Sequence, residues 1–373
     1  MKHTYIADRL FTGQEIISDI PLTIEDDRIL SFETVEGVAQ SRLPGLLVPG
    51  YIDIQVNGGG GILFNQNPAV KTLDQIFTAH AAFGTTGFLP TLITDNLEVM
   101  KKAADAVSSA RARNMPGILG IHFEGPHISM ARKGVHEAGY IRELSEDELC
   151  IYARDDIGIC HLTVAPEMLS PDSIRLLTDM GVIVSLGHSD ATFEETAAAL
   201  DAGARGFTHL YNAMSQLQGR APGMVGAALL SRDSWCGIIM DGYHLHDQSA
   251  RLAISTKARG KIMLVTDAMS PVGTSEAEFD LLGEKVMRHG NKLTIADGRL
   301  AGSVLDMAMA VRNSKERLGL SLKDSLRMAS LYPAEYLGID HETGTLDVGK
   351  RADFILLDDN LNVRSSWVCG VRK

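Results

Sequence analysis

Short apolar runs recur through the middle of the chain, and each is followed by a stretch with the period of an amphipathic helix. Near-continuous apolar runs that alternate with helices are typical of parallel strands buried on both faces. Eight such strand–helix steps predict a (β/α)₈ barrel over residues 46–339. The runs are LLVPGYIDIQV, TTGFLPTLI, ILGIHFEG, ICHLTVAPE, VIVSLGHS, GFTHLYNA, WCGIIMDG and KIMLVTDA.

Both ends of the chain have a different pattern, in which apolar and polar residues alternate. Residues 1–45 predict a short β meander with a turn at Asp26 and Asp27, and residues 340–373 have the same strand-turn-strand character. We therefore expect a small β-sandwich domain built from both chain termini. Residues 279–300, after the eighth barrel run, predict an inserted hairpin.

Composition narrows the class of protein. The 373 residues are 45% hydrophobic and 22% charged, which suits a globular chain with a packed core. The net charge, 35 − 47 = −12, disfavours a nucleic-acid partner. The four cysteines show no Cys-x-x-Cys pair, so we expect reduced thiols and a cytoplasmic location. No apolar run approaches the roughly 20 residues that span a bilayer, so no membrane partner is expected.

Candidate chemistry lies where the expected barrel strands end. In barrels of this kind the active site is at the C-terminal ends of the strands. A single polar residue there could simply be a packed side chain or a helix cap, but seven on one rim indicate a functional site. They are Gln55, Asn57, Glu124, His188, His209, His244 and Asp267.

Three of these residues form a donor set for a metal. Glu124, His188 and His209 supply one carboxylate and two imidazoles, which suit Zn²⁺ or another divalent first-row ion with an open position for water. Structural zinc sites usually have four protein ligands and include cysteine, and no cysteine lies in these motifs. Asp267 could act as general base toward an activated water, although an aspartate there also suits a helix N-cap. The pattern predicts a hydrolytic site.

Several motifs in order resemble the amidohydrolase superfamily, and in particular its branch of N-acetylglucosamine-6-phosphate deacetylases. They are VPGYIDIQVNG, HFEGPH, SLGHSDAT, THLYNAM, MDGYH, VTDAM and GTLDVGKRADFILLD. The resemblance implies a metal-dependent hydrolase of amino-sugar catabolism. Its expected reaction converts the acetamide of N-acetyl-D-glucosamine 6-phosphate into D-glucosamine 6-phosphate and acetate.

The resemblance also implies roles for individual residues. The three expected ligands match the family's metal ligands, and Asp267 matches the base that later gives its proton to the leaving amine. His136, in KGVHEAG, matches a histidine that helps to polarise the acetyl carbonyl.

Four further positions match the part of the family site that holds the substrate. His244 matches a substrate-binding histidine, and Asn212 and Ala213 match a segment that holds the sugar phosphate. Arg220, in GRAPG, matches a phosphate-binding arginine that similar enzymes supply from the neighbouring subunit. A homodimer with Arg220 contributed across its interface is therefore implied.

One departure from the superfamily pattern bears on the number of metal ions. Most members carry His-x-His after the first strand, whereas this chain has Gln55 and Asn57 there. Amide side chains are weak ligands for zinc, so we expect one divalent metal per chain, with both amides forming hydrogen bonds to substrate. Zn²⁺ is the first expectation, and Fe²⁺, Co²⁺ and Mn²⁺ also suit the donor set.

Three alternatives stay open. A deacetylase for the galactosamine epimer would use the same fold and chemistry, although the Gln-x-Asn motif favours the glucosamine enzyme. A cyclic amidase similar to dihydropyrimidinase or dihydroorotase would need a carbamylated lysine, and the fourth run, LTVAPE, has none. A barrel that only binds sugar phosphate would not need the base and the full ligand set that this chain retains.

Overall fold

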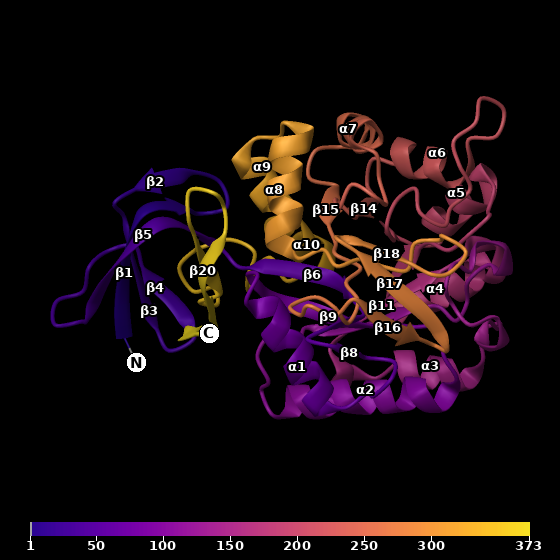
Figure 1. Ribbon diagram of the computed structural model, residues 1–373, viewed down its shortest axis with the longest axis horizontal. Helices are drawn as coiled ribbons and strands as arrows, with labels where there is room; N and C mark the ends of the chain where they lie inside the picture. The colour runs from indigo at the N-terminus through magenta and orange to yellow at the C-terminus, as the bar shows by residue number, and fades with distance from the viewer. Residues whose placement is uncertain (1) are drawn as a thin grey trace.

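The computed structural model describes residues 2–373, in which a barrel stands beside a smaller sheet (Figure 1). Eight strands form the barrel sheet in chain order, and every neighbouring pair is parallel. The predicted (β/α)₈ fold is confirmed. Its strands are β6 (Tyr51–Val56), β9 (Thr85–Ile93), β10 (Gly120–Glu124), β11 (Ile159–Val164), β12 (Ile183–Leu186), β13 (Gly206–Phe207), β14 (Trp235–Ile238) and β15 (Ile262–Leu264).

The barrel closes through contacts just past the end of β15. The Asp267 N–H donates to the Gln55 carbonyl at 3.0 Å, and the Asn57 N–H donates to the Ala268 carbonyl at 2.9 Å. Every residue of β6, β9 and β10 is buried, as expected of strands covered on both faces. Closure brings Gln55 of the first strand next to Asp267 after the last strand.

Helices surround the barrel and begin and end at recognisable signals. The Asn96 side chain caps α2 by accepting from the Val99 N–H, and Gly319 ends α8 in the left-handed conformation at φ 69°. Among residues 2–373, no helix is both long and apolar enough to cross a membrane. The helices are α1 (Val70–Ala81), α2 (Leu97–Ala112), α3 (Glu146–Tyr152), α4 (Pro171–Asp179), α5 (Phe193–Asp201), α6 (Gly223–Leu230), α7 (Asp247–Thr256), α8 (Met307–Leu318), α9 (Leu322–Ala329) and α10 (Leu331–Leu337).

Strands from both ends of the chain form the second sheet, to one side of the barrel (Figure 1). They make one continuous sheet, with the expected turn at Asp26 and Asp27 between β3 and β4, and its apolar side chains form a core of their own around Phe354 and Trp367. The predicted assembly from the two termini is confirmed. The strands are β1 (Lys2–Phe11), β2 (Ile16–Ser18), β3 (Pro21–Glu25), β4 (Arg28–Ser31), β5 (Gln40–Pro49), β19 (Phe354–Leu357), β20 (Val363–Val368) and β21 (Val371–Arg372).

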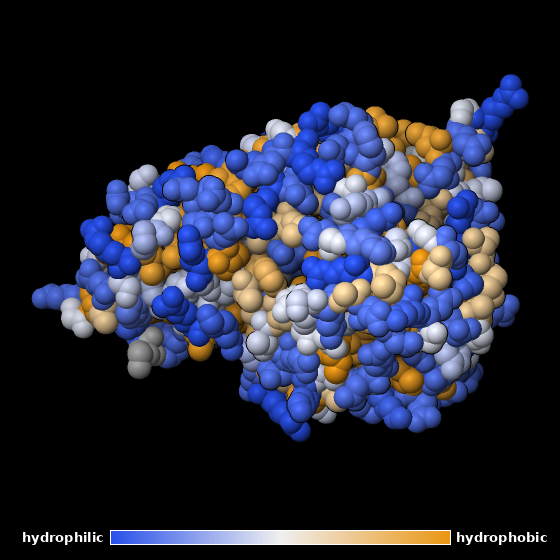
Figure 2. Space-filling model, in the orientation of Figure 1, coloured by the Kyte–Doolittle hydropathy of each residue, from blue (hydrophilic) through white to orange (hydrophobic). Residues whose placement is uncertain are grey.

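The insert after the eighth barrel strand has three antiparallel strands where the sequence predicts a hairpin. They are β16 (Glu278–Leu281), β17 (Glu284–His289) and β18 (Lys292–Thr294), and a small pair, β7 (Gly58–Gly59) and β8 (Ile62–Leu63), follows the first barrel strand. Buried side chains of the insert pack with Ala268 and Met269 in a third apolar cluster. This packing attaches the insert beside the C-terminal end of β15. The face in Figure 2 is largely hydrophilic, with apolar residues in small groups.

Candidate active site

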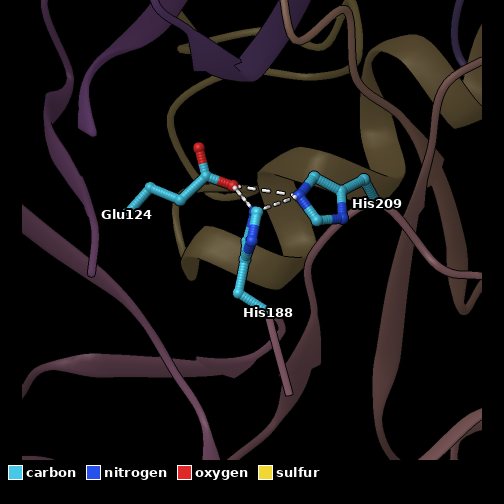
Figure 3. A group of neighbouring side chains, drawn as sticks. All are labelled: Glu124, His188 and His209. Carbon is cyan, nitrogen blue, oxygen red and sulfur yellow. Dashed lines mark hydrogen bonds and ion pairs between the residues drawn. The ribbon is translucent and has the colours of Figure 1, made fainter. Parts of the chain in front are cut away.

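Three side chains from three barrel strands converge at the C-terminal end of the barrel (Figure 3). Glu124 ends β10, and His188 and His209 lie two residues past β12 and β13. The Nε2 atoms of the two histidines are 3.1 Å apart, and they lie 3.3 Å and 3.0 Å from Glu124 Oε1. All three residues are buried. The structure therefore brings the three expected ligands to one point.

Unusual backbone at the strand ends orients these side chains. His188 has φ 47°, His209 has φ 34° and Asp267 has φ 50°. Non-glycine residues adopt this left-handed region rarely, and such residues cluster at functional sites. The conformation is stabilised by the surrounding main chain, since the Ser129 N–H donates to the His188 carbonyl at 2.8 Å. The strained turns are part of how the barrel presents its site.

A backbone carbonyl determines which nitrogen of His188 is free. Its Nδ1 lies 2.9 Å from the Arg132 oxygen, which only accepts, so Nδ1 carries the hydrogen and Nε2 keeps its lone pair. That lone pair faces His209 and Glu124. The potential ligand atoms of the three residues lie within 4.8 Å of one another. Such a set of nitrogen and oxygen atoms fits a divalent first-row metal.

The charges of this buried group are linked. Burial by itself would raise the pKa of Glu124, but the imidazoles of His188 and His209 hold that pKa well below its usual range. Burial also opposes a charge on His209, yet its hydrogen bond to Glu124 raises the pKa of the ring. The site is therefore electronegative enough to hold a cation, whether a proton or a metal ion.

Asp267 lies next to the expected ligands and is held by two amides. The Asn57 Nδ2 donates to Asp267 Oδ1 at 2.7 Å. The Gln55 Nε2 donates to the same oxygen at 3.3 Å and to Glu124 Oε1 at 3.0 Å. Burial, and after it the charge of Glu124, raises the pKa of Asp267 to about 6. The amides thus bind the two carboxylates here, and their contact with substrate stays a prediction.

The loop after β10 brings His136 to the same place, with its ring centre 4.4 Å from that of His188. The Thr94 N–H donates to His136 Nδ1 at 3.3 Å, so in the neutral ring the hydrogen is on Nε2. Burial, and after it the neighbouring His188, holds the pKa of His136 well below its usual value. His136 is therefore a neutral imidazole with an N–H to donate.

A cavity of about 490 Å³ opens over these groups. It is lined by the three expected ligands and Asp267, and by the predicted residues His136, His244, Asn212 and Ala213. The Nδ1 of His244 lies 2.6 Å from Asp241 Oδ2, which fixes the direction of its ring.

Arg220 is outside the cavity of its own chain. It is exposed in a hairpin that is closed by backbone bonds between Gln218 and Ala221, within the loop that projects from the barrel before α6 (Figure 1). Three other cations, which the sequence reasoning missed, line the cavity instead: Arg132, Lys133 and Arg299. Their position beside the KGVHEAG and LAGS segments was the signal that could have indicated them.

Comparisons with known proteins identify the family of this chain. Residues 46–371 match the Amidohydrolase family. The chain is 49% identical over 326 residues to N-acetylgalactosamine-6-phosphate deacetylase of Shewanella sp. (strain ANA-3), covering 87% of this chain and 82% of that relative. The structure of this chain is similar to that of N-acetylglucosamine-6-phosphate deacetylase from Pasteurella multocida, with TM-score 0.96, 34% identity and full coverage of both chains. It also resembles a mutant of the Mycobacterium smegmatis N-acetyl-D-glucosamine-6-phosphate deacetylase in complex with N-acetyl-D-glucosamine-6-phosphate, with TM-score 0.92, 28% identity and coverage of 100% and 99%.

Proposed function

This chain belongs to the amidohydrolase family, and we propose that it hydrolyses N-acetyl-D-glucosamine 6-phosphate to D-glucosamine 6-phosphate and acetate. The observation that carries the proposal is the buried Glu124, His188 and His209 group with Asp267 beside it in one cavity. Each relative described above is named as a deacetylase of a 6-phosphorylated N-acetyl amino sugar. The site chemistry suits that reaction.

An acetamide resists hydrolysis because resonance deactivates its carbonyl and because an amine is a poor leaving group. The reaction needs an activated water, a donor to the carbonyl oxygen and a proton for the nitrogen. A divalent metal held by Glu124, His188 and His209 supplies the activated water when it is bound. Zn²⁺ is our first choice for this ion, with Fe²⁺, Co²⁺ and Mn²⁺ as alternatives.

The chain's own residues supply the other two requirements. Asp267 accepts a proton from the attacking water as the new C–O bond forms. It then delivers that proton to the nitrogen as the C–N bond breaks, so the carboxylate is regenerated. His136 donates its Nε2–H to the carbonyl oxygen, where negative charge develops. Asn57 and Gln55 keep the Asp267 carboxylate next to the ligands throughout.

The amide of Gln55 supports a single metal ion per chain. Its NH₂ group donates to both Glu124 and Asp267, so an N–H donor stands between the two carboxylates. A second cation in this place would meet the N–H hydrogens of Gln55, and an amide nitrogen that donates hydrogen bonds is not a metal ligand. We therefore infer that the site works with one metal.

The galactosamine epimer is the second candidate substrate. The relative from Shewanella, at 49% identity, is named for that sugar phosphate. The two epimers differ in the orientation of one hydroxyl, and the metal, Asp267 and His136 act on the acetamide that both share. The proposed mechanism is therefore the same for either sugar.

We assign the substrate phosphate to His244, to the Asn212 and Ala213 segment, and to Arg220 of a second subunit. A dianion gains nothing from a chain with net charge −12, so its binding depends on local cations. Exposure of Arg220 on a projecting hairpin, away from its own cavity, supports a contribution to a partner in a homodimer. The four free thiols support work in the reducing cytoplasm.

The decisive experiment is an acetate-release assay on both 6-phosphorylated N-acetyl amino sugars, with metal analysis of the same purified protein. We expect turnover that requires a divalent ion and that is lost in Asp267→Asn. The ratio of kcat/KM for the two sugars identifies the preferred epimer. Binding of both sugars without acetate release by the metal-loaded protein would instead identify a sugar-phosphate sensor.

A further inference from the structure

Orientation of His188 depends on a loop that belongs to another part of the chain. The Nδ1–H of His188 donates to the Arg132 carbonyl at 2.9 Å, and the Ser129 N–H donates to the His188 carbonyl at 2.8 Å. The loop that follows β10 is therefore bonded to both the ring and the main chain of this ligand. Any shift of Arg132 would move the partner that fixes the free Nε2 of His188.

The Arg132 side chain returns to the turn that carries His188. Its Nε and Nη2 lie 2.9 Å and 2.7 Å from Asp190 Oδ1. Asp190 is itself fixed, because its N–H donates to Glu167 Oε1 at 2.7 Å, and the neighbouring Ser189 hydroxyl donates to Glu167 Oε2 at 2.6 Å. The loop is thus attached to a turn whose position is fixed by hydrogen bonds to Glu167.

The same short segment also carries His136, whose ring lies against the ring of His188. Between Arg132 and His136 the segment is held at two further points. The Lys133 Nζ donates to the His136 carbonyl at 3.0 Å, and the Arg299 Nη1 donates to the Gly134 carbonyl at 2.8 Å. The ion pair between Arg132 and Asp190 at the start of this segment therefore affects the positions of both the ligand His188 and the donor His136.

We propose that Asp190 is a positioning residue of the metal site, which acts through Arg132 to hold the loop that orients His188. The inference rests on the proposed function, because the metal is part of it. Asp190 does not line the cavity and is not among the ligand atoms. Its contribution is electrostatic and partly screened, since the side chains of Asp190 and Arg132 are 51% and 39% exposed.

The test measures Zn²⁺ affinity of the full-length protein by competition with a chromophoric chelator. Asp190→Asn preserves the shape of the side chain and removes its charge, and we expect Zn²⁺ to bind about two- to fivefold more weakly, the range for a partly exposed ion pair. Asp190→Glu should recover most of the affinity. Because salt screens such a pair, the ratio between wild type and Asp190→Asn should shrink at high ionic strength.

A matched control is available on α4. Asp172 forms an ion pair with Arg175 at 2.7 Å, which is the same distance as between Asp190 and Arg132. Asp172 and Arg175 are more exposed, at 92% and 54%, and their ion pair joins two positions of α4 and not the loop after β10. Asp172→Asn therefore removes a surface charge without releasing that loop, and it should leave Zn²⁺ affinity unchanged. The melting temperatures of both variants should match the wild type, which separates positioning from a general loss of stability.

Two results would overturn the inference: unchanged Zn²⁺ affinity in Asp190→Asn, or an equal loss of affinity in Asp172→Asn. If the affinity is unchanged while KM at saturating Zn²⁺ is raised, Asp190 is a substrate contact instead. The proposed function fails on a different result, in which wild-type protein binds Zn²⁺ but releases acetate from neither sugar. Zn²⁺ affinity of the variants therefore tests the role of Asp190, and acetate release by the wild type tests the proposed function.

Discussion

Substitution of Asn57 by alanine should move the acidic limb of the pH–rate profile to higher pH. The Asn57 Nδ2 donates to Asp267 Oδ1 at 2.7 Å, the shorter of the two amide bonds to that carboxylate. This donor stabilises the ionised form, which accepts a proton in the proposed mechanism. Without it, the pKa of Asp267 rises above the value of about 6 that burial sets here. Because only ionised Asp267 acts as a base in the proposed mechanism, we expect the rate at low pH to fall.

The size of the shift follows from the hydrogen bond. A bond to a charged group contributes about 1.5–3 kcal/mol, and one pKa unit corresponds to about 1.36 kcal/mol. Full loss would therefore raise the pKa by about 1–2 units. Gln55 still donates to the same oxygen at 3.3 Å and offsets part of the loss, so we expect about one unit. A bound divalent cation lowers the pKa in wild type and variant alike, so the difference between them is the quantity to measure.

The assay is kcat/KM for the better sugar phosphate across the acidic and neutral range, at saturating metal. Asn65→Ala is the matched control, because this buried amide donates to the Ile93 carbonyl at 2.9 Å and to Asp95 Oδ2 at 3.0 Å, away from Asp267. An acidic limb that stays in place in Asn57→Ala, or that moves equally in Asn65→Ala, would refute the role given to the amide.

The remaining predictions concern the metal, the base and the phosphate. Elemental analysis should find close to one tightly bound divalent ion per chain, and His188→Ala or His209→Ala should lose it; two equivalents that are both needed for activity would contradict the single-metal site. Asp267→Asn should keep metal and substrate binding but lose about 10²–10⁴-fold in kcat, and a variant with more than about a tenth of wild-type kcat would not fit a general base. Arg220→Ala should lower kcat/KM for the phosphorylated sugar far more than for N-acetylglucosamine, because remote binding energy holds the acetamide in place; equal proportional losses would assign Arg220 to the fold or the dimer.

The sequence predicts the barrel well because its signals are local. A strand buried on both faces must be apolar along its length, so the eight runs are visible without knowledge of what covers them. The insert was predicted less well. Its third strand, Lys292–Thr294, has only three residues, too few for an alternating pattern to be recognised, and it is recognisable as a strand only by its pairing with Glu284–His289.

Some residues of the candidate site could also be predicted from local sequence signals, and others could not. The convergence of Glu124, His188 and His209 could be predicted because they follow apolar runs, and the C-terminal ends of barrel strands meet at one rim. Arg132, Lys133 and Arg299 were missed as cavity residues, because they lie in loops whose paths depend on packing, and only their place in or next to the KGVHEAG and LAGS segments pointed to them.

The sequence by itself therefore determined the fold class, the candidate metal ligands and the residue types at the rim. Only the tertiary structure decided which atoms of those residues are free to act. His188 presents Nε2 because a carbonyl from another loop accepts its Nδ1–H, and Asp267 is held by amides from the opposite end of the barrel sheet. The physical reason is that a hydrogen bond depends on the distance and direction between groups. For residues as far apart in the chain as Asn57 and Asp267, folding alone determines both.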